Sequence, residues 1–190
     1  MKFKSKIFLA PMYEITDVSF RLLCKKYGAG LTFTEMLSPM ALARGNKSTL
    51  RLFDVQFKER PVGIQLMGQN VEEIKKAIKV VENKVDIIDF NFGCPVENIV
   101  KQGAGAALLK RPEKIREIIR AAKSVTKVPI SIKIRSGWDK KSINAVEIAK
   151  IAEEEGCCFI TVHGKTKTQD RGMETDWEII KQVKENVSIP

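Results

Sequence analysis

The sequence lacks the features that mark membrane-spanning, metal-binding and disulfide-stabilised proteins. No apolar run approaches the roughly 20 residues needed to cross a bilayer. The chain has a single histidine and no CxxC pair, so we expect neither a metal site nor a disulfide framework. Its basic and then briefly apolar start could be mistaken for a signal peptide, but the apolar part is short and runs directly into Pro11. We therefore expect a cytoplasmic protein with reduced thiols and no membrane contact.

What the chain has in quantity is positive charge, on a composition otherwise typical of a globular domain. Its 190 residues are 44% hydrophobic and 29% charged, which fits one folded domain with a sizeable core. Lysine and arginine number 33 against 23 aspartates and glutamates, for a net charge of +10. This excess favours a polyanionic partner such as nucleic acid. A lysine- and glutamate-rich surface of the thermophilic kind would also account for it.

Short β-rich runs alternate with longer amphipathic ones along the whole chain, which predicts successive βα units. We expect strands at residues 7–12, 31–36, 62–67, 85–92, 130–135 and 159–163. We expect helices at about 17–27, 71–83, 112–125, 142–155 and 176–185. The longer and more polar stretch 37–59 predicts a helix and a loop. The sequence shows no linker and no second domain.

Periodicity within the expected strands separates a barrel from an open doubly wound sheet. In Pro129-Ile-Ser-Ile-Lys-Ile-Arg135 the isoleucines take one face, and Ser131, Lys133 and Arg135 take the other. An open sheet covered by helices on both sides needs two apolar faces, whereas a barrel can hold polar side chains inside, near its mouth. We therefore predict a (β/α)₈ TIM barrel, of which this chain provides roughly the first six βα units.

Chemically usable residues follow these strands. Asn91 and Cys94 end the fourth strand, Lys133 and Arg135 lie on the fifth, and His163 ends the sixth. Parallel barrels carry their chemistry at the carboxyl ends of the strands, and a thiol that is mostly protonated near neutral pH can donate a proton. Each residue alone has a structural explanation, as a packing cysteine, a surface charge or a core histidine. Their convergence on one rim predicts an active site.

Five ordered motifs resemble those of the tRNA-dihydrouridine synthases. In chain order they are Ala10-Pro-Met12, Gly63-Ile-Gln-Leu-Met-Gly68, Asn91-Phe-Gly-Cys-Pro95, Lys133-Ile-Arg-Ser-Gly-Trp138 and Val162-His-Gly-Lys-Thr166. The resemblance runs from about residue 7 to the end of the chain, and Gly103–Leu109 is similar to the family's loop after the catalytic cysteine. It implies reduction of uridine to 5,6-dihydrouridine in tRNA, with FMN as cofactor and NADPH as the usual reductant. No GxGxxG nucleotide-binding motif is present.

The resemblance also implies a role for each site residue. Reduced flavin gives a hydride to C6 of the uracil, and Cys94 delivers the proton to C5. Lys133 stabilises the anionic reduced flavin. The other cofactor contacts are Pro11, Met12, Tyr13, Gln65 and His163. Asn91 and Arg135 face the substrate base, Lys101 contacts RNA phosphate, and the uridine is extruded from the tRNA fold to reach the flavin.

The chain departs from the family pattern in two respects. Lys165 and Lys167 stand where arginines are common, which keeps the charge but loses the bidentate geometry. The sequence ends at Pro190, where a seventh strand is expected to begin. The last barrel strands, their phosphate-holding loops and a helical tRNA-binding domain therefore have no counterpart in it. We expect a fragment rather than a remnant completed by another chain, and we expect the 190 residues alone to bind FMN weakly.

Two rival functions are carried forward. A dihydroorotate-dehydrogenase-like FMN oxidoreductase also has an Asn-x-x-Cys-Pro type turn, but such enzymes usually carry an asparagine after that proline, where this chain has Val96. A non-catalytic RNA-binding barrel remnant would keep the charge and lose the chemistry. Intact Cys94, Lys133 and His163 argue against that second alternative.

Overall fold

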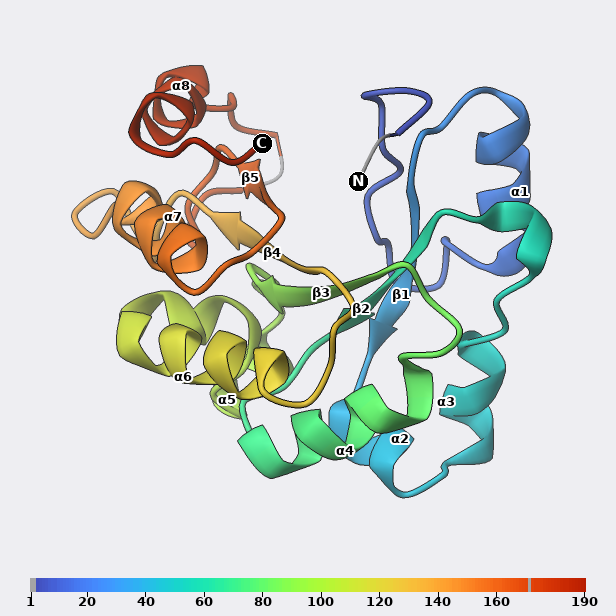
Figure 1. The fold of residues 1–190 in the computed structure, drawn as a ribbon. Coiled ribbons are helices and arrows are strands. Elements are labelled where there is room, and N and C mark those ends of the chain that lie inside the picture. The colour runs from blue at the N-terminus through green and yellow to red at the C-terminus, as the bar shows by residue number, and fades with distance from the viewer. Residues whose placement is uncertain (1–2, 171) are drawn as a thin grey trace.

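The computed structural model describes residues 3–170 and 172–190, and its centre is a curved parallel sheet with helices around the outside (Figure 1). Five strands follow one another in the order β1-β2-β3-β4-β5, and all of their pairings are parallel. The strands are β1 Thr32–Leu37, β2 Val62–Leu66, β3 Ile87–Phe92, β4 Ile130–Arg135 and β5 Phe159–His163. A sheet that curves in sequence order, with helical segments between strands, is an open portion of a (β/α)₈ barrel. The predicted fold class is confirmed.

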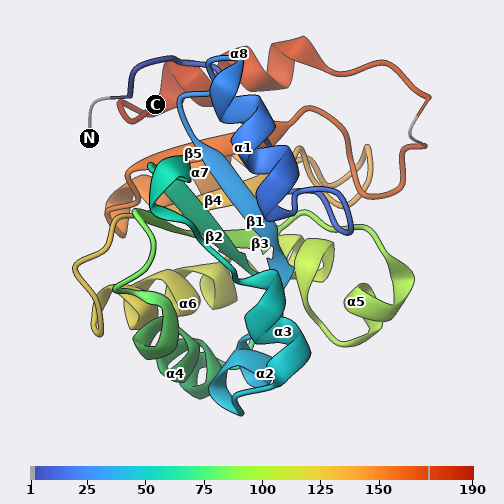
Figure 2. The ribbon, with the colours of Figure 1, turned by 90° about the vertical axis from the view of Figure 1, so that its right-hand side faces the viewer.

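The helices lie before, between and after the strands, and those that begin at residues 18, 71, 112, 145 and 177 fall within the amphipathic runs that predict them. The helices are α1 Val18–Lys26, α2 Pro39–Ala43, α3 Lys47–Leu52, α4 Val71–Val81, α5 Glu97–Lys101, α6 Pro112–Lys123, α7 Ala145–Glu154 and α8 Trp177–Asn186, with 3₁₀ turns η1 Phe57–Glu59 and η2 Gly105–Lys110. The side chains of Asp17, Asn70 and Asp176 accept a hydrogen bond from a first-turn N–H, which satisfies donors that the helix itself leaves unpaired. Figure 2 shows α1 alongside β1.

The main hydrophobic core lies between the sheet and the helices. Ile130, Ile132 and Ile134 of β4 are fully buried there against apolar residues of neighbouring elements, including Ile118 of α6 and Ile148 of α7. Each such side chain contributes roughly 1.5–3 kcal/mol relative to an exposed one. The alternation in β4 therefore sends its isoleucines outward, as predicted, and its polar residues inward.

The amino-terminal end of the barrel interior is filled by aromatic residues. Phe33 of β1 and Phe159 of β5 meet edge to face with ring centroids 6.5 Å apart, and Phe8 lies 5.8 Å from Phe159. A side chain on Gly63 would place a Cβ 2.5 Å from the Phe33 ring, so only glycine leaves room for that ring. The first and last segments of the arc thus meet through one apolar cluster.

Three local predictions differ from the structure. The predicted strand at 7–12 is no regular strand: Phe8 makes one isolated parallel bridge to Leu31, and the segment then reaches Pro11, which has no N–H to continue a ladder. The helix predicted from 142 starts at Ala145, because Ser142 is engaged in a turn with Asp139. The stretch 37–59 forms two short helices and a 3₁₀ turn.

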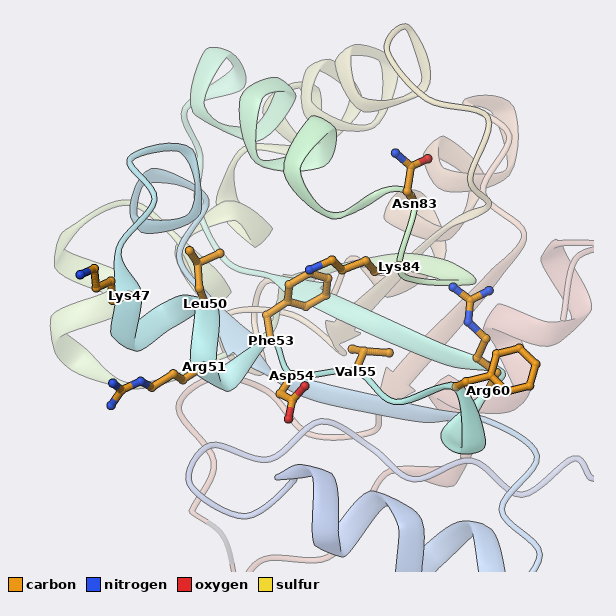
Figure 3. A pocket seen from close by; sticks show the side chains of 10 residues that line it. Lys47, Leu50, Arg51, Phe53, Asp54, Val55, Arg60, Asn83 and Lys84 are labelled. Carbon is orange, nitrogen blue, oxygen red and sulfur yellow. The ribbon is translucent and has the colours of Figure 1, made fainter.

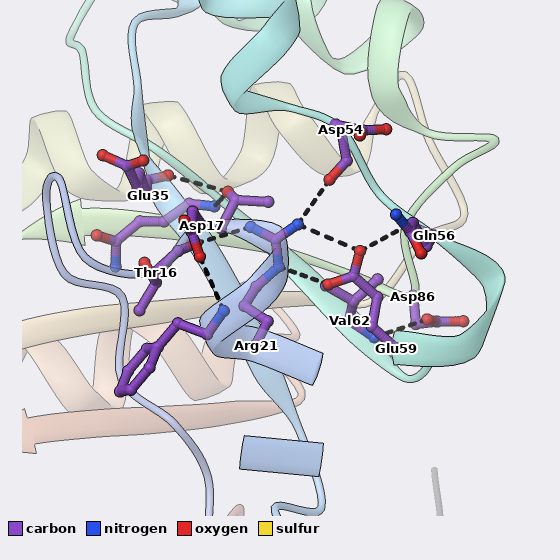
Figure 4. A network of polar contacts seen from close by, with 12 residues as sticks. Thr16, Asp17, Arg21, Glu35, Asp54, Gln56, Glu59, Val62 and Asp86 are labelled. Carbon is purple, nitrogen blue, oxygen red and sulfur yellow. Dashed lines mark hydrogen bonds and ion pairs between the residues drawn. The ribbon is translucent and has the colours of Figure 1, made fainter. Parts of the chain in front are cut away.

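A buried ion pair fixes α1 against η1 (Figure 4). The Arg21 Nε donates to Glu59 Oε2 at 2.5 Å, and both side chains are 0% exposed. The guanidinium also donates to the carbonyl oxygens of Thr16 (2.7 Å) and Asp54 (2.6 Å). Glu59 in turn accepts the N–H of Gln56 at 2.6 Å. The charge is therefore buried with its hydrogen-bonding capacity used, which is the condition for such a pair to be tolerated.

Candidate active site

Strand register brings the predicted residues together inside the carboxyl end of the barrel. Asn91 of β3 is the direct partner of Lys133 on β4, and Arg135 is the direct partner of His163 on β5. Partner residues on adjacent strands lie about 4.8 Å apart and point to the same face. Although Asn91 and His163 are 72 positions apart in the sequence, they therefore lie on the same short part of the barrel wall.

A hydrogen-bonded row of buried side chains forms the base of this site. Gln65 Nε2 donates to Asp89 Oδ2 at 2.6 Å, and Ser131 Oγ donates to Asp89 Oδ1 at 2.6 Å. Asn91 Nδ2 donates to Gln65 Oε1 at 2.8 Å. Burial raises the pKa of Asp89 to about 6, while the donors Ser131 and Gln65 and the charge of Lys133 act in the opposite direction. Asp89 is thus a carboxyl group poised near neutrality in the barrel interior.

Lys133 carries the positive charge at the centre of the site. Burial lowers its pKa, the negative charge of Asp89 opposes that change, and Arg135 adds to it. Cys94 follows β3 and its N–H donates to Asn91, the strand partner of Lys133. A desolvated ammonium with incomplete compensation is well suited to an anionic ligand.

The thiol of Cys94 is held in place by backbone contacts. Asn91 Oδ1 accepts the N–H groups of Gly93 (3.0 Å) and Cys94 (2.8 Å), so its amide caps the turn that follows β3. The carbonyl of Cys94 accepts the N–H of Ala106 at 2.9 Å. Gly105 has φ +57°, and a Cβ there would lie 2.7 Å from the Cys94 oxygen. The thiol residue is 7% exposed at the edge of the cluster.

Arg135 links three strand-end loops. Its Nε donates to the Gly93 carbonyl at 3.0 Å and its Nη1 to the Thr166 carbonyl at 2.6 Å. The predicted contact between Arg135 and the substrate base stays a prediction, as does the corresponding role of Asn91. The structure shows that both side chains position the loops around Cys94.

His163 ends β5 on the same face as Lys133. Burial lowers its pKa to about 4, and the charges of Lys133, Arg135 and Lys165 contribute in the same direction. The imidazole is therefore neutral at physiological pH, with one nitrogen able to donate and the other able to accept a hydrogen bond.

The segment Pro11–Tyr13 lies in the loop before α1. Met12 N–H donates to Thr16 Oγ1 at 3.1 Å, and that hydroxyl donates back to the Met12 carbonyl at 3.0 Å. The N–H of Glu14, which has φ 58°, donates to the buried carboxylate of Glu35 near the end of β1. Tyr13 is 58% exposed, so its aromatic ring is available at the surface of this loop.

Lys101 is not brought into the cluster. It lies on α5, pairs with Glu97 at 2.9 Å, and its side chain is 69% exposed.

Sequence reasoning gave no role to Asp89, Ser131 or Glu35. The available signal was a carboxylate inside an otherwise apolar strand, at Asp89 and again at Glu35.

A hollow of about 820 Å³ lies away from this cluster, outside the barrel wall (Figure 3). It is bordered by α3 on one side and by Asn83 and Lys84 on the other, and the Lys84 ammonium lies 5.5 Å from the centroid of the Phe53 ring. None of the predicted site residues lines it.

Among the residues that the structure describes, no group of three or more His, Cys, Asp or Glu side chains is placed to hold a metal ion. None of the described helices combines the length and apolarity that crossing a membrane requires.

Comparison with known proteins identifies relatives of the whole chain. The chain is 44% identical over 191 residues to tRNA-dihydrouridine synthase B of Pasteurella multocida, covering 98% of this chain and 57% of that protein. It is 39% identical over 192 residues to a probable tRNA-dihydrouridine synthase of Rickettsia bellii, covering 100% and 59%. The chain therefore spans about three fifths of the length of the curated relatives it matches.

A solved structure supports the fold independently. The crystal structure of phosphonopyruvate hydrolase in complex with oxalate and Mg²⁺ superposes with a TM-score of 0.62 at 12% identity, covering 97% of this chain and 65% of that one. At this identity the likeness concerns the barrel architecture alone.

The model of the family described as dihydrouridine synthase (Dus) matches residues 8–190. On that match and on the identity to its relatives, this chain belongs to the dihydrouridine synthase family.

Proposed function

We propose that the protein reduces uridine to 5,6-dihydrouridine in tRNA in the cytoplasm, with FMN as cofactor and NADPH as reductant. The observation that carries the proposal is the strand register that pairs Asn91 with Lys133 and Arg135 with His163, with the Cys94 turn bonded to Asn91 and Arg135. A proton donor, a half-buried cation and neutral hydrogen-bonding groups are what the reduction of a flat, polar base requires.

The residues present fit a flavin ring system. The half-buried Lys133 ammonium has a pKa lowered by desolvation, which the charge of Asp89 offsets only in part, so an anionic ring placed against it would be stabilised. The neutral His163 offers hydrogen bonds at the end of β5, Gln65 would contact the ring from the hydrogen-bonded base of the site, and Pro11, Met12 and Tyr13 offer a loop surface at its rim. When bound, the flavin supplies the hydride.

The chain's own residues then handle the proton and the base. The Cys94 thiol holds the proton destined for C5 of the uracil, and Asn91 fixes the thiol by capping its turn. Arg135, tied to Gly93 and Thr166, keeps the loops on both sides of the thiol in register.

The domain assignment is part of this proposal: residues 1–190 are part of an FMN-binding catalytic barrel. The remaining barrel strands and a helical tRNA-binding domain correspond to the portion of the relatives that this chain does not match.

Replacing the thiol tests the proposal. Unmodified tRNA is incubated with protein, FMN and NADPH, and dihydrouridine is quantified by mass spectrometry of nucleosides. Cys94→Ala should lower the rate about 10²- to 10⁴-fold, the range over which general acids act. Cys24→Ala, which removes a half-buried thiol on α1, should leave the rate unchanged. The proposal fails if wild-type protein reduces orotate but not tRNA, or if Cys94→Ala keeps full activity.

A further inference from the structure

Two lysine ammonium groups are gathered over one tryptophan ring at the rim of the barrel. The Lys110 Nζ lies 3.4 Å from the centroid of the Trp138 ring, and the Lys167 Nζ lies 4.9 Å from it. Trp138 follows β4, Lys110 ends η2, and Lys167 follows β5. We call these three residues the Trp138 rim. Three separate strand-end segments therefore converge on one aromatic side chain.

Backbone hydrogen bonds make the loops of this rim rigid. The N–H of Lys167 donates to the Gly137 carbonyl at 3.0 Å, and the N–H of Thr168 donates to the Trp138 carbonyl at 3.1 Å. Gly137 also bridges to Ile143 on its other side. A Cβ on Gly137 would lie 2.3 Å from the Ser142 oxygen, so this close approach requires glycine. The rim is thus assembled before any ligand arrives.

The positive charge of the rim is balanced only in part by its surroundings. Within the described part of the chain, neither Lys110 nor Lys167 forms an ion pair with an acidic side chain. The nearby Asp139 is engaged with Ser142, whose hydrogen bond is the main cause of its lowered pKa, and the charge of Lys110 adds a smaller lowering effect. Each ammonium gains roughly 0.5–2 kcal/mol from the ring face. Two like charges held on one ring nevertheless repel each other, and an anion would relieve that repulsion.

The rim adjoins the site around Cys94. Trp138 lies three residues after Arg135, and Lys167 lies one residue after Thr166. Arg135 donates to the carbonyls of both Gly93 and Thr166. The guanidinium therefore connects the turn that carries the thiol to the loops that carry the rim. An anion bound at the rim would belong to the same ligand as a base bound in the barrel mouth.

We propose that Lys110 and Lys167, held in position by Trp138, bind the phosphodiester backbone of the RNA next to the nucleotide that enters the barrel. The identity of this partner rests on the proposed function. The fixed aromatic ring sets the positions of two otherwise flexible ammonium groups, so less side-chain entropy is lost on binding. A nicotinamide dinucleotide also carries phosphate, and the experiment separates these two sources.

The test measures equilibrium binding of the full chain to a fluorescently labelled, unmodified tRNA transcript at several salt concentrations. Lys110→Ala and Lys167→Ala should each weaken binding and lower the magnitude of the log–log salt slope by roughly 1. The double variant should lower it by roughly 2. Lys150→Ala removes the same charge from an exposed position on α7 and should change the slope by much less.

A charge-neutral variant distinguishes a positioned pair from a generally basic surface. Trp138→Leu keeps both lysines but removes the ring, and it should weaken binding roughly 3- to 10-fold, because the released lysine side chains lose more conformational entropy when they bind. Trp138→Phe keeps an aromatic face and should lose less than Trp138→Leu. Circular dichroism checks that each variant is folded.

Several outcomes would overturn the proposal. They are salt slopes of the Lys110 and Lys167 variants equal to that of Lys150→Ala, unchanged affinity in Trp138→Leu, or no salt-dependent RNA binding by the wild-type chain. Weakened NADPH binding with unchanged RNA binding would assign the rim to the dinucleotide and also reject it. If the slopes fall as expected while wild-type protein forms no dihydrouridine, the proposed reaction fails and the RNA contact stands.

Discussion

The Arg21–Glu59 pair is fully buried, whereas of the neighbouring groups Asp89 and Lys133 the first is buried and the second is half-buried. Arg21 donates to a carboxylate and to two carbonyl oxygens, and Glu59 accepts from Arg21 and from a backbone N–H (Figure 4). Asp89 accepts only neutral donors at hydrogen-bonding distance, and burial moves the pKa of Asp89 up and that of Lys133 down. The first pair lies outside the barrel wall and the second lies inside it.

The difference separates a structural charge from a reactive one. A buried ion pair whose hydrogen bonds are complete holds two elements together and has nothing left for a ligand. A cation whose charge is only partly balanced by its surroundings can gain electrostatic free energy when an anion binds beside it. The charges are thus fully balanced at the Arg21–Glu59 pair, which holds two elements together. They are only partly balanced around Lys133, in the candidate active site.

Breaking the structural pair should have the largest effect. Arg21→Ala leaves Glu59 buried and unpaired, and it should lower the free energy of unfolding by about 3–5 kcal/mol, measured by urea denaturation. The double variant Arg21→Met with Glu59→Leu removes both charges and should lose much less. A loss under about 1 kcal/mol in Arg21→Ala would show that the pair is not a structural anchor.

The charge of Asp89 should make stability depend on pH with a defined sign. Its pKa is about 6 in the folded chain against 3.8 as the reference value, so the folded state binds the proton more tightly. The contribution of this carboxyl group to the free energy of unfolding is complete below pH 3.8. It is lost as the pH rises through 6, by about 3 kcal/mol in total. The stability of wild-type protein relative to Asp89→Asn should therefore fall between pH 4 and pH 7. A flat difference would contradict the raised pKa.

The charge of Lys133 should be detectable at His163, with the smallest effect of the three. Because the chain has one histidine, a proton NMR titration of the imidazole reports on that residue alone. We expect a pKa near 4 in wild-type protein and an upward movement toward 6.5 in Lys133→Met, since the lysine charge contributes to the lowering. Lys150→Met on α7 serves as the control and should leave the titration unchanged. An unaltered pKa in Lys133→Met would place the two groups in separate environments.

The sequence predicted the barrel wall well because its signal is local. The alternation in Ile130–Arg135 depends only on neighbouring residues, and β4 and β5 have the predicted bounds. The same alternation put Gln65, Asn91 and Lys133 on one face, and the register confirms that arrangement. The irregular segment before Pro11 was not predictable in this way, because a strand needs a partner and the partner is distant in sequence.

The contacts that tune the site were beyond sequence reasoning for the same reason. Arg21 and Glu59 are 38 positions apart, and nothing in their local patterns marks them as a pair. Asn91 and Arg135 were assigned to the substrate, whereas the structure shows them bonded to loop backbone. Whether they also touch a base stays a prediction. The Trp138 rim requires three loops to meet, and only coordinates show that.

The turn at Gly105 has a consequence for how this loop can change over evolutionary time. Besides the side chains of Asn91 and Arg135, main-chain atoms help to define the position of Cys94, because Ala106 N–H donates to the Cys94 carbonyl and the backbone of Gly105 passes close to that oxygen. Substitutions between residues 96 and 102 can therefore alter the polarity of the loop while the Cys94 backbone keeps its position. The positions that can vary and the positions that hold the turn are therefore separated within a dozen residues, and the two glycines with positive φ, Gly103 and Gly105, belong to the second group.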